Sequence, residues 1–191
     1  KNTDVKEVIF DDNKAIGVKS KNGKIFYGEK IIFNSDPAYT YKYIIKKKKK
    51  WSDKKIDKLD FSMGLFVIYF GTKKKYNDIA HHTIWMGERY QGLLKDIFNR
   101  KILANDFSLY LHRPTATDKS MAPKNCDSFY VLSPVPNLKS GIDWNVMGAQ
   151  YRKKILEALE KTILPNLTKN LTVCFHMSPE DFKRDYHSLY G

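Results

Sequence analysis

Five histidines and one dense polar cluster are the residues of this chain whose types and spacing could support chemistry. The cluster covers residues 112–118, beginning with His112 and Arg113, and it follows directly on an apolar segment that predicts a strand. Ionisable groups at the end of a strand are a common place for a functional site. The alternative is that they make turn hydrogen bonds and anchor the strand end. His112 and Arg113 are therefore the catalytic candidates that the residues themselves offer.

Self-contained catalytic and metal-binding motifs are absent from the sequence. It has no HExxH, no Cys/His quartet, no GxSxG, no phosphate-binding GxxxxGK[ST] and no GxGxxG. His81 and His82 are adjacent, so within a strand their side chains would point to opposite faces, and we expect no metal site. Cys126 and Cys174 are too few for a disulfide framework, which favours a reducing, cytoplasmic setting.

The hydrophobic pattern of the sequence predicts both strands and helices, and hence an α+β, or mixed α/β, fold in which helices pack on a sheet and position these residues. A hairpin turn is predicted at Asn22 and Gly23, and residues 31–33 predict a short buried strand. The longest helix is predicted over residues 144–163, because apolar residues recur there on one stripe. Further helices are predicted near residues 39–45, 89–98 and from 178 onward. The main strands are predicted at residues 62–70, 82–86, 107–112, 128–133 and 171–175.

A net charge of +13 in 191 residues invites a nucleic-acid or anionic-membrane partner. Only five of the 34 basic residues are arginines, however, and arginine is the residue that reads phosphates and base edges in pairs of hydrogen bonds. We therefore expect no nucleic-acid partner. The lysine block at residues 46–50 predicts an exposed loop, with lipid headgroups as an alternative contact. No apolar run approaches the roughly 18 residues that a membrane-spanning helix needs.

A long, ordered series of motifs resembles the bacterial-type phytoene desaturases, the FAD-dependent carotenoid desaturases. Residues 33–41 read FNSDPAYTY, which is similar to the family's NADPAYTY turn, and residues 81–90 read HHTIWMGERY, which resembles its HHTI…G.RY stretch. The similarity covers essentially the whole chain. It continues in family order at residues 96–98, 106–112, 114, 117–118, 122–123, 129–136, 144, 159–160, 164–165 and 179–182.

The resemblance implies a flavoprotein with a two-part, amine-oxidase-like fold. Residues 1–37 then correspond to a β-hairpin piece of the FAD-binding domain, and residues 38–191 to the substrate-binding domain. Asn34 and Asp36 are the implied cofactor contacts. The family's GxGxxG is missing from this sequence. We therefore expect the chain to be a piece of a longer protein, unable by itself to hold FAD tightly or to catalyse the reaction.

The implied reaction is desaturation of phytoene or a related carotene, in which a hydride passes to the flavin and a proton leaves the neighbouring carbon. The protein would supply a long apolar channel. Strand alternation puts Phe107 on one face, and Tyr110 with His112 on the other, so only one of these sets can face that channel. The expected substrate-binding residues are Phe66, Tyr69, Phe107, Tyr110, His112, Tyr130 and Leu132.

The implied substrate dissolves in a bilayer, so the resemblance also predicts a cytoplasmic protein that docks peripherally on a membrane. A basic surface with exposed aromatic residues suits attachment to anionic lipids. Two alternatives stay open. One is a carotene or retinoid isomerase or saturase of the same fold, and the other is a non-catalytic, basic module that binds lipids or membranes.

Overall fold

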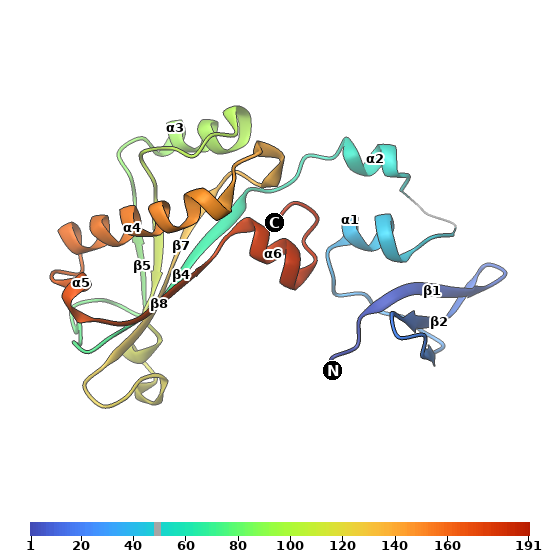
Figure 1. Ribbon diagram of the computed structural model, residues 1–191, viewed down its shortest axis with the longest axis horizontal. Coiled ribbons are helices and arrows are strands. Elements are labelled where there is room, and N and C mark those ends of the chain that lie inside the picture. The colour runs from blue at the N-terminus through green and yellow to red at the C-terminus, as the bar shows by residue number, and fades with distance from the viewer. Residues whose placement is uncertain (48–50) are drawn as a thin grey trace. The chain divides into compact units, whose positions relative to one another are not determined.

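The computed structural model describes residues 1–47 and 51–191, so Lys48–Lys50 of the lysine block lie outside the described residues. The chain divides into two compact units (Figure 1). Unit 1 comprises residues 1–61 and 183–189, and unit 2 comprises residues 62–182 and 190–191. The predicted assignment of residues 1–37 to an FAD-binding domain and 38–191 to a substrate-binding domain stays a prediction. Within the described residues, no helix combines the length and apolarity required to cross a bilayer.

Unit 1 is built on a three-stranded antiparallel sheet. Its strands β1 (Val5–Asp11), β2 (Lys14–Ser20) and β3 (Ile25–Tyr27) are neighbours in chain order, and the β2–β3 pair confirms the hairpin predicted at Asn22 and Gly23. Helix α1 (Pro37–Tyr39) continues as the π-helical turn η1 (Thr40–Ile44), and the short helix α2 (Asp53–Asp57) follows. The strand predicted at residues 31–33 is wrong. Ile32 is 91% exposed, because this apolar triplet pairs with no strand of the described sheet.

Gly17 lies in β2 directly opposite Tyr27 of β3. A Cβ atom at this position would lie 2.6 Å from the backbone oxygen of Phe26, which cannot move without disturbing the strand pairing. We expect Gly17→Ala to lower the free energy of unfolding by about 1–3 kcal/mol, in the range of overpacking substitutions. Gly28→Ala is the control, because its nearest neighbour would be 3.5 Å away. Urea denaturation of both variants tests the difference, and equal stabilities would contradict it.

Unit 2 contains a five-stranded antiparallel sheet. Its strands are β4 (Gly64–Thr72), β5 (His82–Trp85), β6 (Leu109–His112), β7 (Asp127–Val135) and β8 (Leu171–Met177), in the spatial order β5-β6-β7-β4-β8. All five predicted strands are confirmed. The predicted end of the fourth at residue 133 is too early, because β7 continues through Pro134 to Val135 in register with β4.

Helices of unit 2 pack around this sheet. Helix α3 (Tyr90–Lys95) runs into the π-helical turn η2 (Asp96–Arg100), and α4 (Trp144–Thr162) is the long helix that the apolar stripe predicted. Helix α5 (Leu167–Asn170) precedes β8, and α6 (Pro179–Tyr186) follows it, with residues 179–182 in unit 2 and residues 183–186 in unit 1. Three single 3-10 turns complete the connections: η3 (Pro114–Ala116), η4 (Lys119–Met121) and η5 (Leu138–Ser140).

The core of unit 2 lies between α4 and one face of the sheet, across which α4 runs (Figure 1). Side chains of β4, β6 and β7 alternate, and one set from each strand meets the apolar stripe of the helix. The fully or nearly fully buried members are Phe66, Ile68, Phe70, Tyr76, Phe107, Leu109, Leu111, Phe129, Val131, Val135, Trp144, Tyr151, Ile155, Leu159, Leu164 and Leu167. The side chains on the opposite face of the sheet, here called the outer face, are not covered by α4.

Candidate functional site

The outer face carries one continuous row of rings across all five strands. The pairing registers place His82 opposite His112, His112 opposite Tyr130, Tyr130 opposite Tyr69, and Tyr69 opposite Phe175. A second row, also one residue per strand, lies beside it and is mainly aliphatic. The members of this second row are Ile84, Tyr110, Leu132, Val67 and Met177.

The rings of the first row touch their neighbours. Tyr69 stacks on Phe175 with centroids 5.2 Å apart, and His112 packs against Tyr130 at 4.6 Å. A hollow of about 390 Å³ opens over this row, walled by Tyr69, Tyr130 and Phe175 and by Pro114 and Met121 from the loop after β6. Phe175 is 52% exposed, so the row is not sealed beneath other described residues. The surface is thus apolar, ring-lined and accessible.

The phenol of Tyr130 is held in its neutral form. Burial raises the pKa of Tyr130 to about 12, and the neighbouring phenols of Tyr110 and Tyr69 act in the same direction. Burial also lowers the pKa of His112, as do His81 and His82 beside it. Both effects favour uncharged groups at this end of the hollow, which suits an apolar occupant.

Five of the seven predicted substrate-binding residues share the outer face: Tyr69, Tyr110, His112, Tyr130 and Leu132. Phe66 and Phe107 do not share it. Phe66 is fully buried, with its ring 5.1 Å from that of Tyr151, and Phe107 packs edge-on against the same tyrosine. These two phenylalanines therefore belong to the core under α4. Alternation within β4 separates Phe66 from Tyr69, whereas Phe107 precedes the first residue of β6 by two positions.

Phe175 was missed by sequence reasoning, although it completes the ring row. Its place depends on β8 pairing with β4, about a hundred residues earlier in the chain. The predicted strand at residues 171–175 contained the residue, but nothing in its local pattern gave the partner strand. The signal available in the sequence was an aromatic residue between Cys174 and His176 in a predicted strand.

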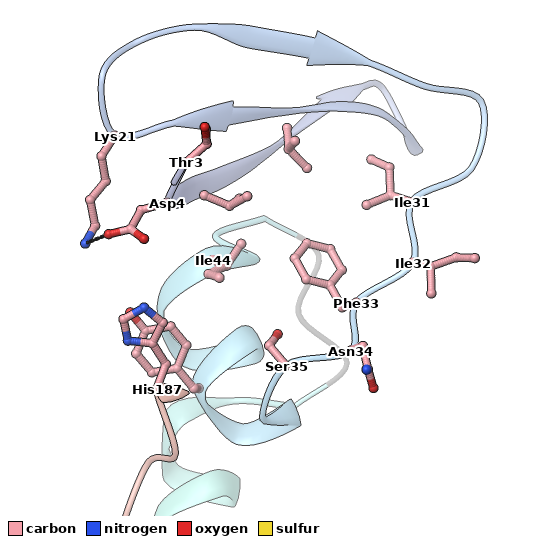
Figure 2. A pocket seen from close by; sticks show the side chains of 13 residues that line it. Thr3, Asp4, Lys21, Ile31, Ile32, Phe33, Asn34, Ser35, Ile44 and His187 are labelled. Atoms are coloured by element: carbon pink, nitrogen blue, oxygen red, sulfur yellow. Dashed lines mark hydrogen bonds and ion pairs between the residues drawn. The ribbon is translucent and has the colours of Figure 1, made fainter. Parts of the chain in front are cut away.

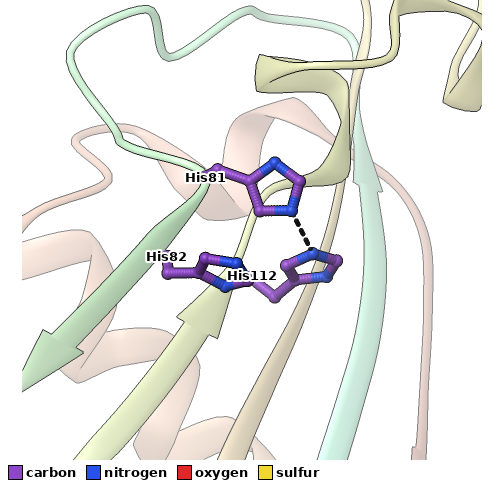
Figure 3. A group of neighbouring side chains, drawn as sticks. All are labelled: His81, His82 and His112. Atoms are coloured by element: carbon purple, nitrogen blue, oxygen red, sulfur yellow. Dashed lines mark hydrogen bonds between the residues drawn. The ribbon is translucent and has the colours of Figure 1, made fainter.

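Three histidines meet where β5 begins and β6 ends (Figure 3). His81 lies just before β5, so the expectation that His81 and His82 point to opposite faces of a strand is wrong. The Nε2 atoms of His81 and His112 are 2.7 Å apart. Nδ1 of His81 is 2.8 Å from the Thr117 hydroxyl, and Nδ1 of His82 is 2.6 Å from the Tyr110 hydroxyl. The prediction that no metal binds rested on a geometry that the structure does not have.

Arg113, the other catalytic candidate, is buried away from the hollow. Its Nε and Nη2 donate to the carboxylate of Asp127 at 3.0 and 3.2 Å, and its Nη1 donates to the carbonyl of Ile79. The same carboxylate accepts from the Thr115 hydroxyl and the Tyr76 amide. Asp127 is 1% exposed. Of the two alternatives for Arg113, the structure supports the anchor of the strand end.

His176 gives the fold a dependence on pH. It lies on the α4 side of β8, stacked on Phe66 at 4.9 Å, and its pKa is lowered by burial and by the nearby charge of Arg152. The unfolded state, with a histidine pKa near 6.5, then takes up a proton more readily than the folded state. We expect the free energy of unfolding to fall as the pH drops below about 6.5. His176→Leu should flatten that slope in urea denaturation between pH 7.5 and 5, and an unchanged slope would contradict the assignment.

Unit 1 has its own cavity, of about 440 Å³ (Figure 2). Its wall is apolar at Ile31 and Phe33, and its one salt bridge joins Lys21 to Asp4 at 2.8 Å. Asn34, an implied cofactor contact, lies exposed on the cavity lining. The other implied contact, Asp36, does not line it.

Both carboxylate oxygens of Asp36 are already engaged by backbone groups. One accepts from the amide of Tyr39 at 2.8 Å and so caps α1, and the other accepts from the amide of Leu189 at 3.2 Å. The donors around the cavity thus fit the uncharged part of a flavin nucleotide, through Asn34 and an apolar wall. They do not fit its pyrophosphate, because the charge of Lys21 is paired with Asp4.

Comparison with curated proteins gives matches along the full chain. It is 42% identical over 198 residues to the phytoene desaturase (neurosporene-forming) of Rhodobacter capsulatus, and 37% identical over 193 residues to the phytoene desaturase (lycopene-forming) of a Paracoccus species. Each match covers 100% of this chain and 38% of the relative. The chain thus spans little more than a third of the relatives' length. The resemblance found in the sequence motifs is confirmed. No family model matches the chain.

Comparison with solved structures supports the fold. An oxidoreductase from Methanosarcina mazei aligns with 92% of this chain and 37% of its own, at a TM-score of 0.55 and 15% identity. Cyclohexylamine oxidase from Brevibacterium oxydans aligns with 98% of this chain and 35% of its own, at a TM-score of 0.51 and 9% identity. The predicted α+β fold of an amine-oxidase-like protein is thereby confirmed.

Proposed function

We propose that this chain, which is homologous from end to end to a segment of the bacterial-type phytoene desaturases, is part of an FAD-dependent oxidoreductase that desaturates phytoene or a related carotene. Unit 2 supplies the surface on which the polyene binds. The relatives' names state desaturation of phytoene for those proteins.

The outer face of unit 2 is the observation that carries this proposal. A polyene is long, flat and without polar groups, so it is recognised by buried area and by contact with rings, and scarcely by hydrogen bonds. The paired rows of rings and aliphatic side chains offer such contact along a line that crosses five strands. Tyr69 and Tyr130 lie at the middle of that line.

The chain's own residues position and shield the substrate in this proposal. When bound in the complete protein, FAD accepts the hydride that leaves the polyene. Tyr69, Tyr130 and Phe175 line the hollow, hold the polyene flat against the sheet and exclude water from it. Leu132 extends this apolar surface in the second row. Asn34 contributes to holding the flavin from unit 1, and Asp36 orders the neighbouring backbone by capping α1. The pyrophosphate site is assigned to parts of the protein outside this chain.

Peripheral attachment to the cytoplasmic face of a membrane is part of the same proposal. The net charge of +13 favours anionic lipid surfaces. Apolar side chains exposed around β5, α3 and η2 support insertion among lipid headgroups, with Ile84 the most exposed at 70%. The others are Met86, Tyr90, Phe98 and Ile102. Flotation with anionic and with neutral liposomes tests this attachment, and equal binding to both would contradict the electrostatic part.

The function is tested by assaying the full-length protein with FAD and phytoene in anionic liposomes, followed by product separation. We expect visible absorption to develop only when FAD is present, because each new double bond lengthens the chromophore. A product with the formula of the substrate would indicate the isomerase alternative, and a shortened chromophore would indicate a saturase. Membrane binding without any product, despite bound flavin, would favour a non-catalytic lipid-binding module.

A further inference from the structure

We propose that His81, His82 and His112 form a binding site for Zn²⁺ at the edge of the sheet of unit 2. One ligand nitrogen from each ring lies within 4.8 Å of those from the other two. The three rings come from the residue before β5, the first residue of β5 and the last residue of β6. Figure 3 shows them converging on one point. This site does not depend on the desaturase proposal.

Strand pairing fixes two of the three rings. His82 and His112 are directly opposite each other in the β5–β6 ladder, and their rings stack with centroids 5.2 Å apart. His81 is outside the ladder, so its side chain is free of strand alternation and turns towards the same point. Three ligands carried by two hydrogen-bonded strands form a largely preformed set.

Hydroxyl groups orient two of the rings as metal sites require. Ligating histidines use their second ring nitrogen for a hydrogen bond that fixes the tautomer and the ring plane. The Thr117 hydroxyl is 2.8 Å from Nδ1 of His81, and the Tyr110 hydroxyl is 2.6 Å from Nδ1 of His82. Both contacts leave Nε2 for a metal. His112 is held by ring contacts with His82 and Tyr130.

The distances allow a metal after a small adjustment. Two nitrogens bound to one tetrahedral Zn²⁺ stand about 3.3 Å apart, since each Zn–N bond is about 2.0–2.1 Å. The Nε2 atoms of His81 and His112 are 2.7 Å apart, so these two rings must separate by about 0.6 Å, whereas a pair at the 4.8 Å limit of the cluster must approach by about 1.5 Å. The side chain of His81 can supply this movement by rotation, while its backbone carbonyl stays held by the Arg113 amide at 2.9 Å.

The ligand set favours Zn²⁺ over harder cations. Imidazole nitrogen suits Zn²⁺, whereas Mg²⁺ and Ca²⁺ require oxygen ligands. No carboxylate joins the three histidines in this cluster as the structure describes it. Three protein ligands leave a fourth position for water. Such a site would tie the start of β5 to the end of β6, beside the hollow that His112 helps to line.

The test uses the full-length protein, stripped of metal with a chelator and titrated with Zn²⁺ by calorimetry. We expect one Zn²⁺ site that His82→Ala weakens by at least 100-fold, and His81→Ala by a comparable factor. His187→Ala is the matched control, because His187 lies in unit 1. The Zn²⁺ affinity of this variant should stay within twofold of that of the parent protein. Circular dichroism checks that each variant is folded.

X-ray absorption at the zinc edge gives a second readout that needs no variant. We expect a first shell containing three imidazole nitrogens at about 2.0 Å. Failure to bind Zn²⁺, affinity unaffected by His81→Ala and His82→Ala, or a first shell without three imidazoles would each overturn the site. These readouts are independent of carotene turnover, so their failure is distinguishable from failure of the proposed function.

Discussion

Replacing Asp127 by alanine is expected to lower the free energy of unfolding by about 3–5 kcal/mol, the range for breaking a buried ion pair by removing one partner. The carboxylate is 1% exposed and accepts four hydrogen bonds, two of them from Arg113. Without it, the guanidinium of Arg113 stays buried and keeps the carbonyl of Ile79 as an acceptor. The Thr115 hydroxyl and the Tyr76 amide also lose their acceptor. Urea denaturation at pH 7 measures the change.

An exposed pair provides the matched control. Lys153 and Glu157 stand 3.9 Å apart on α4, with side chains 81% and 50% exposed. Lys153→Ala should change the free energy of unfolding by less than about 0.5 kcal/mol, because water screens such pairs. If Asp127→Ala costs no more than Lys153→Ala, the buried network does not anchor the end of β6, and Arg113 returns as a candidate for chemistry.

The strands of unit 2 were predictable because their composition and alternation are local properties. Residues 62–70 and 128–133 are runs of branched and aromatic residues, and both became central strands of the sheet. The apolar stripe of α4 was equally visible. Residues 31–33 show the limit of such patterns. An apolar triplet forms a strand only where a partner is available, and Ile32 is instead 91% exposed.

The candidate site was predictable only in part. The alternation of side chains along a strand divides them between two faces, but it does not say which face packs in the core. Alternation in the strand predicted at residues 107–112 separated Phe107 from Tyr110 and His112, but the position of α4 decides which set is covered. Whether the three histidines can meet depended on the residue at which β5 begins, and a difference of one residue decides it. With β5 beginning at His82, His81 is free to turn towards His112, which an alternating pattern through both residues forbids.

A negative charge in the middle of the outer face is expected to abolish most carotene turnover. Leu132 stands between Tyr110 and Val67 in the second row and next to the ring row, so an apolar substrate that lies across both rows must cover it. Covering a carboxylate with a polyene strips its water and offers no partner in return. We expect Leu132→Glu to lower kcat/KM for phytoene at least about 100-fold, equivalent to roughly 3 kcal/mol.

The same substitution elsewhere distinguishes this loss from a general effect of added charge. Val146 on α4 is 58% exposed, and Val146→Glu should leave kcat/KM within twofold of the parent. Thermal melting shows whether the Leu132→Glu protein is folded. If it is folded and still binds FAD, the loss of turnover is a loss of substrate binding. A conservative Leu132→Met, which keeps the face apolar, should retain most turnover. Normal turnover by a folded Leu132→Glu protein would contradict binding across the second row and would leave the ring row and its hollow, which Leu132 does not line, as the place of the polyene.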